Sequence, residues 1–84
     1  MDAEITEKEI FFAGNTVKRE CVFRFFPLAS PMIEISAVIE AIAPEPFFVA
    51  ADETAEEAFN REAQSVLWQA TTEKLEELEK LLPE

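Results

Sequence analysis

The first 26 residues alternate apolar and polar positions in two runs, residues 4–13 (EITEKEIFFA) and residues 16–26 (TVKRECVFRFF). Gly14 and Asn15 stand between the runs, and Gly-Asn between two β-forming segments is typical of a hairpin turn. The sequence therefore predicts an antiparallel β-hairpin over residues 4–26.

The charges in the two runs predict how the strands pair. A three-residue loop over residues 13–15, with Asn15 left-handed, pairs positions whose numbers sum to 28. That register sets opposite charges against each other across the strands: Glu9 with Arg19, Lys8 with Glu20, and Glu4 with Arg24. A two-residue loop would instead place Glu9 against Glu20, so we favour the three-residue loop.

The same register gathers the odd-numbered side chains on one face of the hairpin. It sets Phe11 against Val17 and Ile5 against Phe23. We expect this face to form the core side, with Ile5, Phe11, Val17, Cys21, Phe23 and Phe25. The basic residues Lys18, Arg19 and Arg24 then serve as cross-strand partners for the acids of the first strand.

The segment over residues 30–43 fits two elements. As a helix, it begins with Ser30 as N-cap and Pro31 at the first position, and one stripe holds Met32, Ile35, Val38, Ile39 and Ile42. As a strand over residues 33–42, it alternates Ile33, Ile35, Ala37 and Ile39 with Glu34, Ser36 and Glu40. The Ser-Pro start and the alanines favour the helix, and the strand stays open as the alternative.

Residues 44–52 are predicted to be a stiff connector, because Pro44 and Pro46 flank Glu45. From Thr54 onward the chain predicts an acidic helix over residues 54–82, with Thr54 and Glu57 as a capping box. The apolar stripe shifts after residues 71–72, from Phe59, Ala63, Val66 and Ala70 to Leu75, Leu78 and Leu82. This shift predicts either a break there, which would give a helix pair, or a final segment that faces another neighbour.

Together these segments predict a single domain over residues 1–84 of the α+β class. It consists of an N-terminal hairpin, a helix or third strand, and a long acidic C-terminal helix or helix pair. At 84 residues, the chain is short enough that its own core is small.

The composition excludes several kinds of chemistry. Histidine and tyrosine are absent, Gly14 is the only glycine and Cys21 the only cysteine. An imidazole base, the usual zinc sites, an internal disulfide and a glycine-rich phosphate loop are therefore excluded. We expect a protein that is not an enzyme and holds no cofactor or metal, with Cys21 as a small buried residue.

The net charge of −11 limits the kinds of molecule that the protein is expected to bind. Residues 45–84 hold eleven acidic and three basic residues, and such an excess repels nucleic-acid phosphates and anionic lipids. No segment approaches the roughly 18 apolar residues that span a bilayer. We expect no direct nucleic-acid binding and no membrane insertion, and the lone thiol points to the cytoplasm.

The paired phenylalanines at 11–12, 25–26 and 47–48 favour a role in binding. Adjacent rings on an extended chain point to opposite faces, and so small a domain cannot cover both faces of a hairpin. Exposed rings on soluble proteins are typical of contact sites, so we expect a protein partner and self-association. The candidate contact residues are Phe26, Phe47, Phe48, Trp68 and Leu75.

The acidic segment TEKLEELEK supports two interpretations. Its carboxylates could imitate phosphates and occupy a basic, nucleic-acid-handling protein, as inhibitors of the anti-CRISPR or anti-restriction type do. They could equally form a solvated helix face mixed with lysines. The residues concerned are Glu73, Glu76, Glu77 and Glu79.

One family resemblance bears on function. EIFFAGNTVKRECVFRFFPL, followed by an isoleucine-rich segment, resembles the start of small bacteriophage tail-assembly chaperones, over residues 7–43. The resemblance implies a hairpin that leads into helices, and a role in holding tail components during assembly, in the host cytoplasm. It assigns no individual site residue.

Overall fold

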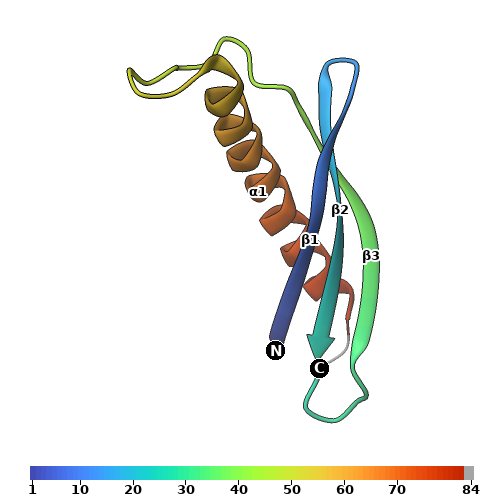
Figure 1. Ribbon diagram of the computed structural model, residues 1–84. Coiled ribbons are helices and arrows are strands. Elements are labelled where there is room, and N and C mark those ends of the chain that lie inside the picture. The colour runs from blue at the N-terminus through green and yellow to red at the C-terminus, as the bar shows by residue number, and fades with distance from the viewer. Residues whose placement is uncertain (83–84) are drawn as a thin grey trace.

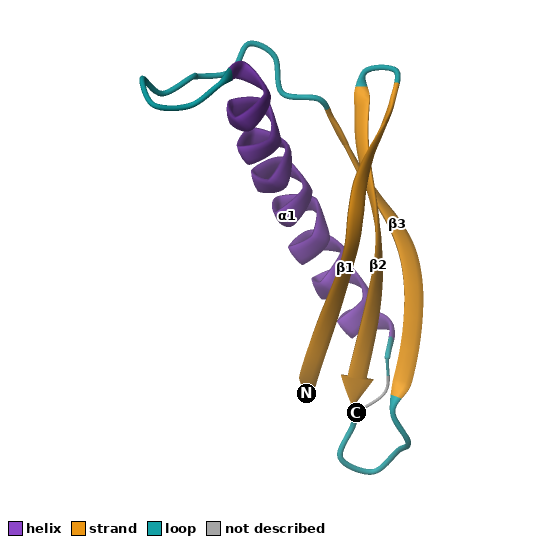
Figure 2. Cartoon of the chain, in the orientation of Figure 1, coloured by secondary structure: helices purple, strands orange, loops and turns teal. Residues whose placement is uncertain are grey.

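The structure, a computed structural model, describes residues 1–82. It contains β1 (Asp2–Ala13), β2 (Thr16–Phe26), β3 (Ile33–Ile42) and α1 (Ala55–Leu81). The strands form one antiparallel sheet in the order β1-β2-β3, and α1 lies obliquely on one face of it (Figures 1 and 2). The predicted α+β class and the N-terminal hairpin are confirmed.

Residues 33–42 form a strand, so the favoured prediction of a helix over 30–43 was wrong. Both periodicities fit the sequence, and pairing with β2 along the whole length of residues 33–42 decides between them. The odd-numbered residues of β3 face α1, and Ile39 among them is buried. Only the strand lets every second apolar residue reach this core.

The hairpin turn has two residues rather than the predicted three. Ala13 pairs with Thr16, and Gly14, rather than Asn15 as predicted, carries a positive φ of 63°. A positive φ at the first central residue alone is the signature of a type II′ turn, whose twist suits a hairpin. Glycine adopts this conformation without steric strain.

A β-bulge at Lys8 and Glu9 reconciles this turn with the charges. From Asp2 to Glu7 the pairing follows the predicted register, so Glu4 opposes Arg24 and Ile5 opposes Phe23 as expected. Beyond the bulge the register shifts by one, which places Ile10 rather than Glu9 opposite Arg19. The bulge sets Lys8 as well as Glu9 against Glu20, and the Lys8–Glu20 ion pair offsets the like charges that a two-residue turn brings together.

The bulge also exchanges the two faces of β1. A shift of one residue sends each side chain to the opposite face of the sheet. Phe11 therefore opposes Lys18 and points away from α1, which corrects its predicted place in the core opposite Val17. Phe12 takes the helix side and packs against Phe59, with ring centroids 5.5 Å apart.

The core lies between the sheet and α1, which packs against β2 and β3. Its buried residues are Val17, Cys21, Phe23, Phe25, Ile39, Ala63, Leu67 and Leu78. A sheet and one helix make two layers, and the molecule measures 51 × 26 × 18 Å. Burial is therefore confined to a single narrow seam.

The helix is continuous from Ala55 to Leu81, so neither a break at 71–72 nor a helix pair occurs within the described residues. Thr71 is fully buried and continues the stripe that Leu67 begins. Its hydroxyl donates to the Leu67 carbonyl at 2.7 Å, which satisfies the polar group inside the core. The apolar pattern of the sequence is interrupted at this point because a threonine, which is not apolar, occupies one of the buried positions.

The predicted capping box at the start of α1 is confirmed. Thr54 accepts a hydrogen bond from the Glu57 backbone N–H, and the Glu57 carboxylate accepts one from the Thr54 N–H. Two of the otherwise unpaired donors at the helix start are thereby satisfied.

Arg19 is the one charged residue buried on the core side of the sheet within residues 1–82. Its Nε donates to the Lys8 carbonyl at 2.8 Å, Nη1 pairs with the Glu7 carboxylate, and Nη2 donates to Gln64 Oε1 at 2.9 Å. One guanidinium thus joins the bulge of β1 to the middle of α1.

Replacement of Arg19 tests this bridge. We expect Arg19→Ala to lower the free energy of unfolding by about 3 kcal/mol, because it leaves the Glu7 carboxylate and the bulge carbonyl without their hydrogen-bonding partner. Urea unfolding measures the change. Arg24→Ala, which removes an exposed ion pair from the same strand, should cost less than about 1 kcal/mol. Equal losses in the two variants would contradict the bridging role.

Candidate protein-interaction surfaces

The face of the sheet opposite α1, here called the open face, is uncovered by any element of residues 1–82 (Figure 1). It carries the even-numbered residues of β2 and β3 and of the part of β1 up to Lys8, together with Phe11 from beyond the bulge. One side of a sheet this narrow would ordinarily be polar if it faced only water. The open face is not uniformly polar.

Three ion pairs cross the strands on the open face. Lys8 Nζ lies 2.8 Å from Glu20, Lys18 Nζ lies 3.4 Å from Glu40, and Arg24 Nε lies 2.8 Å from Glu34. The Lys8–Glu20 pair is the one predicted from the sequence, whereas Arg24 turns to Glu34 of β3 rather than to Glu4. The hydrogen bond from Lys8 to Glu20 raises the pKa of the lysine. Exposed pairs of this kind contribute little stability, and they fix strand register.

Apolar side chains lie around this ladder of charges. Phe11 is 48% exposed and Ile42 74% exposed near the hairpin turn, Val38 is 56% exposed at mid-strand, and Phe26 is 39% exposed at the far end. These four residues are more apolar than solvation of the open face requires. They define the first candidate contact surface.

The connector before α1 presents a second candidate surface. The Phe48 side chain is 72% exposed, whereas Phe47 is half-buried with its ring 5.5 Å from that of Phe59. A groove of about 460 Å³ opens beside the Phe59 ring, lined by residues that include Phe12 and Ile42.

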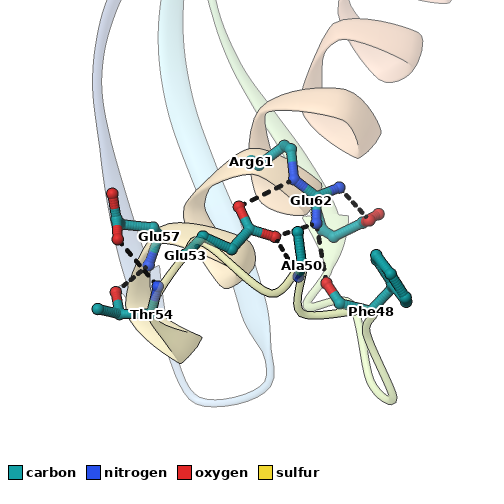
Figure 3. Close-up of polar contacts among 7 residues, drawn as sticks. All are labelled: Phe48, Ala50, Glu53, Thr54, Glu57, Arg61 and Glu62. Carbon is teal, nitrogen blue, oxygen red and sulfur yellow. Dashed lines mark hydrogen bonds and ion pairs between the residues drawn. The ribbon is translucent and has the colours of Figure 1, made fainter.

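Arg61 holds the connector in place (Figure 3). Its Nη2 donates to the Phe48 carbonyl and to Glu53 Oε1, both at 2.8 Å, and Nη1 contacts Glu62 at 2.7 Å. Glu53 also accepts the Ala50 N–H at 2.8 Å. The Phe48 ring is therefore presented from an ordered loop.

The acidic residues predicted as a site lie on two sides of α1. Glu73 and Glu77 flank a groove beside β3, where Lys74 lies 3.5 Å from Glu77. Glu76 and Glu79 are exposed, and no ion pair involves them within the described residues. Charge mixing with lysine is thus limited to one weak pair.

The predicted contact residues do not form one surface. Phe26 lies at an end of the open face, Phe48 on the connector and Trp68 on an exposed side of α1, while Leu75 packs on the core. The sequence reasoning missed Phe11, Val38 and Ile42. Once residues 33–42 are taken as a strand, Val38 and Ile42 fall at even positions, on the same face as Glu34, Ser36 and Glu40. This pattern could have indicated that both side chains are exposed.

The described residues offer little for catalysis. No three His, Cys, Asp or Glu side chains within residues 1–82 gather closely enough to hold a metal ion. Burial raises the pKa of the Cys21 thiol, whose sulfur lies 3.9 Å from the Thr71 hydroxyl, so the thiol stays protonated and unreactive. Nor does any helix in this part of the chain have the length and apolar character needed to cross a membrane.

Comparison of the chain with protein-family models, with curated proteins and with solved structures found no match. The surfaces must therefore be interpreted from their own chemistry.

The connector should loosen in acid. Hydrogen bonds from Arg61 and from the Ala50 N–H hold the pKa of Glu53 below its ordinary value of 4.5. A carboxyl whose pKa is lowered in the folded state contributes stability above its unfolded value, and that contribution is lost as the pH falls through the folded value. The difference in unfolding free energy between the wild type and Glu53→Gln should be constant at neutral pH and shrink below about pH 4.5.

Thermal or urea unfolding between pH 7 and pH 3 measures this difference. Glu56→Gln is the matched control, because it removes the same charge from a neighbouring carboxylate that makes no bond to Arg61. A Glu53→Gln difference that stays constant down to pH 3 would refute the proposed role of this carboxylate.

Proposed function

We propose that this protein is a non-enzymatic binding module whose main contact surface is the open face of its sheet. The observation that carries the proposal is a sheet covered on one side only, with Phe11, Phe26, Val38 and Ile42 exposed on the other. Exposed apolar groups among charges are typical of interfaces that form and separate, where apolar anchors lie among polar contacts.

The absence of catalytic activity is part of the proposal. The carboxyl whose pKa is clearly displaced among the described residues is that of Glu53, and its partners Arg61 and Ala50 hold the connector. The groove near Phe12 and Phe59 is lined by one carboxylate, that of Glu45. A displaced pKa tied to a structural ion pair gives no support to acid–base catalysis.

The resemblance of residues 7–43 to bacteriophage tail-assembly chaperones suggests what such a module would do. We propose an assembly or accessory role, in which the protein covers a surface of another component and also associates with itself. A cytoplasmic location, in the host if the protein is encoded by a phage, is supported by the buried reduced thiol of Cys21.

Removal of the open-face rings tests the proposal. Affinity capture from an extract of the cells that naturally contain the protein should retain specific partners with the wild type. We expect the double variant Phe11→Ser, Phe26→Ser to lose them by more than about tenfold, because an aromatic anchor contributes about 2 kcal/mol. The double variant Phe48→Ser, Trp68→Ser removes two exposed rings outside the open face and should retain them.

Two results would overturn the proposal. Loss of partners from the Phe48 and Trp68 variant alone would place the contact on the connector and helix. Retention by both variants of the same proteins would show that aromatic contacts do not carry binding.

A second candidate function rests on how the charges are sorted. The four basic residues of the sheet, Lys8, Lys18, Arg19 and Arg24, all pair with sheet carboxylates. Most of the negative excess consequently lies on the connector and α1, where Glu73, Glu76 and Glu79 have no ion pair within the described residues. Helix carboxylates without a basic partner are the feature that a nucleic-acid mimic would present to a basic protein.

The mimic hypothesis predicts strong salt dependence. Binding to a basic, nucleic-acid-handling partner should weaken at least tenfold between 50 and 300 mM salt and should compete with DNA, because screened surface charges would carry it. The triple variant Glu73→Gln, Glu76→Gln, Glu79→Gln should reduce both affinity and salt dependence. Affinity that is unchanged by salt would exclude this function and leave the open-face proposal intact.

A further inference from the structure

The two edges of the sheet differ in their protection. The outer edge of β1 has four acidic residues, Lys8 and a bulge, which are the devices that keep sheet edges from pairing. β3 has no lysine, arginine, proline or bulge along its ten residues, and its register with β2 is continuous. The unprotected edge of this sheet is β3.

The free backbone groups of β3 can be assigned. The Ala43 N–H donates to the Asn15 carbonyl at 2.8 Å, and these two residues continue the β2–β3 register. In an antiparallel pair, hydrogen-bonded positions alternate, so the odd-numbered residues of β3 bond to β2. The N–H and C=O groups directed to the free edge belong to Glu34, Ser36, Val38, Glu40 and Ile42.

We infer that β3 pairs antiparallel with β3 of a second copy, across a two-fold axis at Val38. The outward-directed residues, 34 to 42, are symmetric about Val38, so this register gives each of their N–H and C=O groups a partner. The adjacent symmetric registers, centred on Ala37 or Ile39, leave one end residue unpaired. The inference rests on the proposed self-association and names the strand and register that produce it.

The side chains agree with the register centred on Val38. On the open face, Glu40 opposes Ser36 of the second copy and Glu34 opposes Ile42, so no two carboxylates face each other. On the helix side, the larger Ile39 opposes Ala37, and Ile35 opposes Ala41, which alternates large and small groups across the pair. Centring on Ala37 would instead set Glu34 against Glu40.

Access to the edge is open from the helix side. A shallow groove of about 220 Å³ runs between Val38 and Ile39 of β3 and Glu73 and Glu77 of α1. Pairing there would join the two sheets into one, with both helices on the same side and both open faces on the other. The apolar groups of the two open faces would then lie on one continuous surface.

A pair of lysine substitutions tests the register. Val38 and Ser36 are both exposed on the same face of the same strand, so Val38→Lys and Ser36→Lys change the charge equally and leave the core intact. In the inferred dimer, the lysine introduced at 38 meets its own symmetry mate, whereas the lysine introduced at 36 meets Glu40. We expect Val38→Lys to raise the dimer dissociation constant at least tenfold. Ser36→Lys should either leave this constant unchanged or reduce it.

Sedimentation equilibrium at several protein concentrations measures these constants, and circular dichroism confirms that each variant is folded. A wild type that stays monomeric at millimolar concentration would overturn self-association. The capture experiment with the open-face variants would still test the open-face proposal independently. Equal weakening by both lysines would indicate stacking through the open face, and no effect of either would indicate another surface. Both of these results would overturn pairing through β3.

Discussion

The arrangement of this molecule depends on the guanidinium of Arg19. A charged group on the core side of a sheet is costly to desolvate unless it is fully paired. Arg19 meets this condition through Glu7, the Lys8 carbonyl and Gln64, which come from the residue before the bulge, from the bulge itself and from α1. The carbonyl it binds is that of a bulge residue, so the bulge and the buried charge stabilise each other.

From this contact follows the unequal use of the two faces of the sheet. The bulge turns Phe12 toward the helix and Phe11 toward the open face, while Lys8 of β1 and the even positions of β2 hold the remaining bases at the surface. Those bases neutralise the carboxylates of neighbouring strands. What remains is a sheet face with paired charges and exposed apolar groups, together with a helix and connector that carry most of the negative excess. The two proposed functions correspond to these two surfaces.

The sequence predicts local features well where one residue type has one physical use. Gly14 marks the turn, the Thr54–Glu57 pair marks the helix start, and the acid–base pattern predicts half of the hairpin register. It fails where two structures satisfy the same pattern. Residues 33–42 match the period of a helix and of a strand, and pairing with β2 decides between them. The continuity of the buried helix stripe could not be predicted at Thr71, because the burial of this polar residue depends on the hydrogen bond from its hydroxyl to the Leu67 carbonyl.

The sequence predicts that one face of the hairpin stays uncovered, but most residues of the open face could not be predicted, because this face is defined by where the helix does not lie. Phe11 and Phe12 are chemically identical, and their exchange of faces depends on one additional residue earlier in the strand. Val38 and Ile42 read as core residues until the third strand is known. Which apolar groups a small two-layer domain leaves exposed is a property of its topology.

The bulge makes the length of β1 as constrained as its composition. Deletion of a single residue at position 8 or 9 would abolish the change of parity, so the turn and the apolar face of Ala3 and Ile5 could no longer both be satisfied. A strand that tolerates many substitutions at its exposed positions would thus be intolerant of one missing codon.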